Sequence, residues 1–60
     1  MRYVIRDPVT DLYVLSWHDT GGALSRIEWV EKARASSYKG RSEAKDVLAA
    51  APPGVVFEPR

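Results

Sequence analysis

The segment from residue 32 to residue 41 gathers the side chains best suited to hold an anion. It has four basic residues, no acidic residue and one aromatic ring: Lys32, Arg34, Tyr38, Lys39 and Arg41. The cations predict phosphate binding, with Tyr38 stacking on a base, or contact with an acidic protein. A solvated surface without a ligand stays open as a third interpretation, because the net charge of the whole chain is only +1.

The remaining polar residues do not form a catalytic or metal-binding set. His18 is the one histidine, it lies beside Asp19, and the chain has no cysteine. Nucleophilic catalysis and metal coordination both need more partners than this. The pair Gly21 and Gly22 lacks the spacing of phosphate-binding loops and predicts a turn. We therefore expect no enzyme activity, no metal, no cofactor and no small-molecule substrate.

The second expected strand, residues 12–17, is apolar on both faces. Leu12 and Val14 alternate with Tyr13, Leu15 and Trp17. Because one helix covers only one face of a sheet, the other face is either partly exposed or a surface for a protein partner or a second copy. The candidate partner-binding residues are Leu12, Tyr13, Val14 and Trp17.

The two tryptophans allow two interpretations. Trp17 and Trp29 both fall at expected strand ends, and we place both on the inner side of the sheet. That position predicts core packing, because a large aromatic ring gains most from burial. Either residue is alternatively an interface anchor, since tryptophan is enriched at binding hot spots.

Four strands and one helix are expected to position these residues. The strands are predicted at residues 3–5, 12–17, 25–29 and 55–58, where β-branched and aromatic residues concentrate. The helix is predicted at residues 41–50, with Gly40 as its N-cap and an apolar stripe along one side. Residues 30–35 predict a single helical turn, and residues 38–40 a connector.

These elements predict one α+β domain over residues 1–60, in the order β-β-β-α-β. A mainly antiparallel sheet of three to four strands carries the helix on one face. The fourth strand is placed beside the first and parallel to it, after a right-handed crossover. The predicted spatial order is fourth, first, second, third.

The composition predicts the cellular compartment of the protein. The chain has 60 residues, of which 45% are hydrophobic, so a folded domain of modest stability is expected. The absence of cysteine favours a reducing compartment. No apolar run approaches the ~20 residues of a membrane span, and the first residues lack the apolar core of a signal peptide. We expect a cytoplasmic protein that does not bind membranes.

The spacing of aromatic and alanine residues resembles that of small bacteriophage and prophage proteins. The pattern comprises Tyr3-x-Ile5, Tyr13-Val14-Leu15, Trp29, Ala33, Tyr38, Glu43-Ala44, Leu48 and a closing Val-x-x-Glu. It spans nearly the whole chain and departs at Gly40, where a serine or threonine N-cap is expected. The resemblance implies a fold and a short accessory protein that binds a host protein, and it assigns no functional residue.

The function predicted from the sequence is a non-enzymatic protein-binding module that acts on a host protein or self-associates as a homodimer. The alternative is a nucleic-acid-binding accessory protein that uses the basic segment 32–41.

Overall fold

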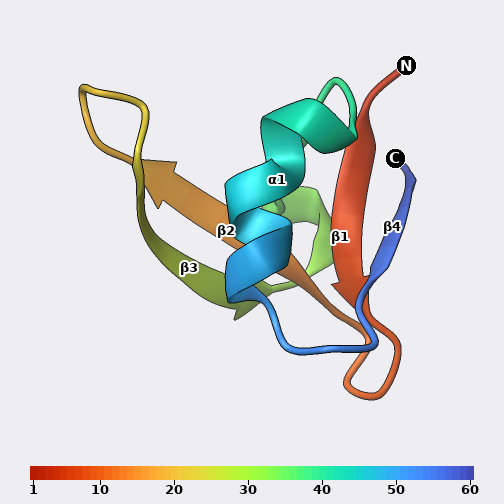
Figure 1. Ribbon diagram of the computed structural model, residues 1–60. Helices are drawn as coiled ribbons and strands as arrows, with labels where there is room; N and C mark the ends of the chain where they lie inside the picture. Colours follow the sequence, from red (N-terminus) through yellow and green to blue (C-terminus); the bar gives the residue numbers. More distant parts are fainter.

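Four strands, one α-helix and one short 3-10 helix make up the computed structural model, which describes residues 1–60 (Figure 1). In chain order the elements are β1 (Tyr3–Asp7), β2 (Leu12–His18), β3 (Leu24–Val30), η1 (Lys32–Arg34), α1 (Arg41–Ala50) and β4 (Val56–Pro59). The predicted α+β class and the predicted helix are confirmed. The single helical turn expected near residues 30–35 is η1.

Short polar side chains shape both hairpin turns. In the first turn the Asp7 carboxylate accepts a hydrogen bond from the Val9 amide at 2.9 Å. Asp11 closes this turn with a φ of 61°, a left-handed conformation that aspartate tolerates better than most residues. In the second turn the Asp19 carboxylate accepts hydrogen bonds from the amides of Gly21 and Ala23. These turns set the register in which β1 pairs with β2 and β2 pairs with β3.

Gly40 and Glu43 define where α1 begins. Gly40 is the N-cap, as expected, and Glu43 lies in the first turn near the positive end of the helix dipole. The Glu43 carboxylate accepts a hydrogen bond from the Lys39 amide at 3.1 Å, and this bond fixes the entry of the chain into the helix. Ala51 ends the helix, and the two prolines that follow cannot extend it. No helix in the structure is long and apolar enough to cross a membrane.

The strands lie in the predicted order, β3-β2-β1-β4, but every neighbouring pair is antiparallel. The prediction that the fourth strand runs parallel to the first is therefore wrong. The reason is that residues 31–40 already carry the chain back to the start of β1, where Tyr38 forms an antiparallel bridge with Tyr3. Helix α1 then runs toward the far end of β1, so β4 begins opposite Arg6 and returns (Figure 1).

The sheet is split between its two central strands, and the chain itself fills the gap. β1 and β2 pair directly only at Arg6–Tyr13 and Asp7–Leu12. Beyond that point residues 35–38, here called the inserted segment, bond to both strands. The Ser36 amide donates to the Val14 carbonyl at 3.0 Å, and Tyr38 exchanges two 2.8 Å backbone hydrogen bonds with Tyr3. The inserted segment leads from η1 on one face of the sheet to α1 on the other.

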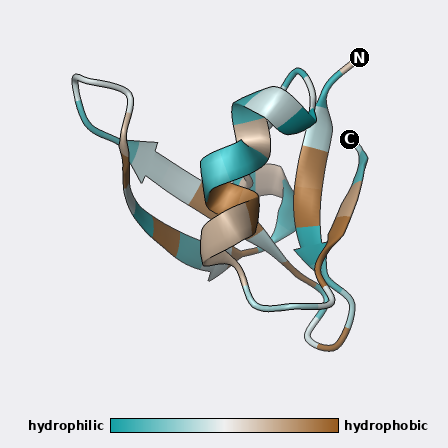
Figure 2. Cartoon of the chain, in the orientation of Figure 1, coloured by the Kyte–Doolittle hydropathy of each residue, from teal (hydrophilic) through white to brown (hydrophobic).

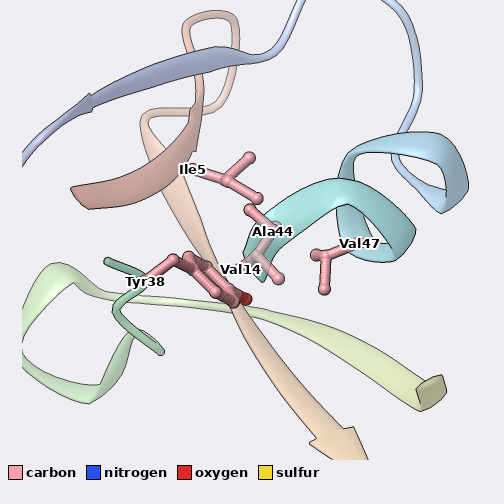
Figure 3. Close-up of a cluster of buried hydrophobic side chains, with 5 residues drawn as sticks. All are labelled: Ile5, Val14, Tyr38, Ala44 and Val47. Atoms are coloured by element: carbon pink, nitrogen blue, oxygen red, sulfur yellow. The ribbon is translucent and has the colours of Figure 1, made fainter. Parts of the chain in front are cut away.

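A hydrophobic cluster fills each face of the sheet. The larger one lies under α1, where Figure 3 shows its five buried side chains converging; they are Ile5, Val14, Tyr38, Ala44 and Val47. The smaller one lies on the opposite face and consists of Val4, Val30 and Ala35. Figure 2 shows hydrophobic residues concentrated on β1 and on the middle of α1, while the tip of the β2–β3 hairpin is neutral to hydrophilic. The prediction that only one face is covered is thus corrected, since η1 and Ala35 cover part of the second.

Candidate functional site

The face of the sheet opposite α1, here called the outer face, carries a row of apolar and aromatic side chains on β2 that are partly exposed. Tyr13, Leu15 and Trp17 alternate along β2 on this face, and all three are half-buried. Tyr13 and Leu15 pack against the smaller cluster under η1. Trp17 packs against neither cluster. The cover that the chain supplies to its outer face therefore ends before Trp17.

The Trp17 ring is instead covered by the guanidinium of Arg26 from the neighbouring strand β3. The register of β2 and β3 places Arg26 opposite Trp17, and the guanidinium lies 4.1 Å from the ring centroid. Arg26 also forms an ion pair with Glu28 at 3.7 Å, on the same face. The placement of Trp17 on the inner side is corrected: it lies on the outer face, whereas Trp29 lies under α1.

Two further cations border the outer face. The Lys32 ammonium of η1 lies 6.0 Å from the Tyr13 ring centroid. Arg6 donates a hydrogen bond to the Glu58 carboxylate at 2.9 Å and approaches Asp11 at 3.5 Å. The hydrogen bond to Glu58 raises the pKa of Arg6, so the Arg6 guanidinium is charged at neutral pH. Arg6 therefore ties β4 to β1, while Lys32 forms no ion pair within the chain.

The candidate partner-binding residues fall on two different faces. Tyr13 and Trp17 lie on the outer face and are partly exposed, so a partner can contact them. Val14 is fully buried under α1, so the expectation that it contacts a partner is corrected. Leu12 is 37% exposed but points to the same side as Val14, because alternate strand residues share a face. Sequence reasoning missed Arg26, whose contact with Trp17 becomes visible only once the strand register is known.

The basic segment 32–41 does not form one surface. Lys32 contacts Tyr13 on the outer face, whereas the Arg41 guanidinium lies 5.1 Å from the Phe57 ring centroid on the α1 side. Tyr38 is 3% exposed, and its hydroxyl is hydrogen-bonded to that of Ser16 at 2.8 Å. The expectation that Tyr38 stacks on a base is therefore corrected. Arg34 and Lys39 are exposed, at the end of η1 and just before α1.

A polar pocket of about 360 Å³ lies where the end of β2, the inserted segment and the start of α1 meet. Its lining is almost entirely polar and consists of Ser16, His18, Gly22, Ser36, Ser37, Tyr38, Glu43 and Asp46. The Ser16 hydroxyl bonds to Tyr38, and the Ser36 hydroxyl bonds to the backbone of β2 at residue 16, so neither is paired with His18. No group of three or more acidic, histidine or cysteine side chains is close enough to hold a metal ion.

Comparison of the chain with protein-family models, with curated proteins and with solved structures finds no significant match. Functional assignment therefore depends on the geometry of the chain.

Proposed function

We propose that the chain is a non-enzymatic protein-binding module whose partner contacts the outer face at Trp17. The observation that carries this proposal is that a half-buried tryptophan lies outside both hydrophobic clusters. Tryptophan and arginine are the side chains most enriched at the energetic centres of protein interfaces, and here they are stacked at 4.1 Å. Leu15 and Tyr13 continue the apolar surface toward η1.

The charges of η1, at the Tyr13 end of the outer face, favour a partner with acidic side chains. Lys32 and Arg34 of η1 are exposed and form no ion pair, whereas Arg6 is already bonded to Glu58. A partner that inserts an apolar side chain beside Trp17 and brings a carboxylate to η1 would match this surface in both shape and charge. The resemblance to phage and prophage proteins makes a bacterial cytoplasmic protein the first class to test.

Capture experiments with matched variants test the proposal. The wild-type chain, Trp17→Ala and Lys45→Ala are immobilised, and each is exposed to the same bacterial lysate. Lys45 is exposed on α1, so its substitution leaves the outer face intact. We expect a protein that is retained by the wild type and by Lys45→Ala and whose retention falls at least ~10-fold on Trp17→Ala, because hot-spot truncation typically costs 2 kcal/mol or more. Equal retention by all three chains would contradict the proposal.

A spectroscopic readout locates the contact independently of capture. Trp29→Phe leaves Trp17 as the single tryptophan, because the chain has two. Addition of the captured protein should then shift the fluorescence of Trp17 toward shorter wavelength as the ring loses water. In the reciprocal variant, Trp17→Phe, the signal from Trp29 should stay unchanged, since Trp29 lies under α1. A response confined to Trp29 would place the binding surface elsewhere.

A further inference from the structure

The two edges of the sheet differ in how they are protected from pairing with another strand. β4 has four residues and ends at Pro59, which has no amide hydrogen to donate. β3 has seven residues and contains no proline. Beyond the ladder with β2, no backbone hydrogen bond involves residues 24–30, so the outward-facing amides and carbonyls of β3 are without partners in the chain. β3 is the edge that is open to strand addition.

The charges on β3 are arranged to match a second copy of the same strand. Arg26 and Glu28 flank Ile27 and both point to the outer face, because they lie opposite Trp17 and Leu15 of β2. Their side chains are 62% and 46% exposed and form an ion pair with each other at 3.7 Å, so each can exchange this partner for the opposite charge of a second copy at the edge. In an antiparallel pair centred on Ile27, Arg26 of each copy lies directly opposite Glu28 of the other.

Other registers of the same strand are less favourable. A pair centred on Arg26 or on Glu28 places like charges directly opposite each other, which is destabilising. A pair centred between two residues sets the outer face of one strand against the inner face of the other. A register shift between Trp17 and His18 ends the regular ladder near Ser25, so the paired stretch spans residues 25–29. Among the registers centred on residues 26, 27 and 28, only the one centred on Ile27 places opposite charges directly across the junction.

We propose that the protein forms a two-fold symmetric dimer in which the β3 edges of two copies pair antiparallel about Ile27. The two sheets then join into one sheet of eight strands, and two Arg26–Glu28 ion pairs cross the junction. The paired stretch is short, so the dissociation constant is expected at ~10–1000 µM. This surface is the edge of the sheet. It adjoins the site at Trp17 and shares Arg26 with it, because Arg26 stacks on the Trp17 ring.

Charge reversal at the two positions tests the proposal by sedimentation equilibrium from ~1 µM to ~1 mM protein. Arg26→Glu and Glu28→Arg each place like charges across the junction, and each should weaken dimerisation by at least ~10-fold. The double variant with both substitutions restores opposite charges across the axis and should dimerise like the wild type. An equimolar mixture of the two single variants should form a mixed dimer, because one strand is then wholly acidic and the other wholly basic at these positions.

Lys45→Glu on α1 changes the net charge as much as Arg26→Glu does and serves as the control, with circular dichroism to confirm that each variant is folded. Its dimerisation should equal that of the wild type. A wild type that stays monomeric at ~1 mM would overturn the proposal. Dimers that persist equally in both single variants would overturn it as well, because they would use another surface. Trp17→Ala keeps both charges of the β3 edge and should dimerise like the wild type, so failure of partner capture and failure of dimerisation are separate results.

Discussion

The two faces of the sheet are covered by helices of very different length, α1 on one side and η1 on the outer face. Under α1, a ten-residue helix closes a cluster of five buried side chains. On the outer face, a three-residue 3-10 helix and Ala35 close a cluster of only three. The shorter cover leaves the end of β2 bare, and the tryptophan there is shielded by an arginine instead of by the core. Incomplete cover thus leaves one end of the outer face partly exposed, and this end is the surface proposed to contact a partner.

The largest effect is expected from truncation of the core beneath α1. Ile5 is fully buried between β1 and the helix, and Ile5→Ala leaves a cavity that neighbouring strands cannot fill. We expect a loss of about 3 kcal/mol in the free energy of unfolding, measured by urea denaturation. A loss below about 1 kcal/mol would show that this face is not the main core.

A smaller loss is expected from the corresponding truncation on the outer face. Val4 is also fully buried, but it belongs to the three-residue cluster under η1. Val4→Ala removes two methyl groups, and we expect it to cost about 2 kcal/mol by the same measurement. A cost near zero would mean that η1 does not cover this face. Only the face under α1 would then contain a packed core.

Loss of one hydrogen bond in the inserted segment should cost less again. Tyr38→Phe keeps the buried ring but removes the hydroxyl that is bonded to Ser16 at 2.8 Å. We expect the free energy of unfolding to fall by about 1 kcal/mol, the net contribution of a typical hydrogen bond. Tyr13→Phe is the matched control, because no hydrogen bond involves the Tyr13 hydroxyl. Equal effects of the two substitutions would count against the bond.

The smallest loss of stability is expected at Trp17. Because its ring lies outside both clusters, Trp17→Ala should lower the free energy of unfolding by about 1 kcal/mol or less, well below the 3–5 kcal/mol typical of a buried tryptophan. Trp29→Ala, beneath α1, should cost more than Trp17→Ala in the same urea series. The reverse order would assign Trp17 to the core and would contradict its proposed role in binding.

Much of the fold follows from local patterns in the sequence. Concentrations of β-branched and aromatic residues predicted the strands, and the spacing of Ala44, Val47 and Leu48 predicted the helix. The hydrogen bond of Asp7 in the first turn and the Gly40 cap also act locally. The direction of β4 could not be predicted in this way, because it depends on where residues 31–40 take the chain. That path is set by backbone pairing of Tyr38 with Tyr3, 35 positions apart.

The candidate site was predicted only in part, for the same reason. Tyr13 and Trp17 were identified because residues 12–17 are apolar on both faces of the strand, and this pattern is local. Arg26 was missed because its contact with Trp17 is set by the register of two strands. Tyr38 was misplaced, since a tyrosine between basic residues is typical of an exposed segment, and only the gap between β1 and β2 explains its burial.

Native-state hydrogen exchange followed by NMR tests most directly whether the chain closes its own sheet. The amides of Ser36 and Tyr38 donate to the carbonyls of Val14 and Tyr3 in the structure. We expect these two amides to exchange within ~10-fold of the rates in the β1–β4 ladder, and far more slowly than the exposed turn amide of Thr20. Exchange of Ser36 and Tyr38 as fast as that of Thr20 would show that the inserted segment does not pair with the strands, and the account of a partly covered outer face would be contradicted.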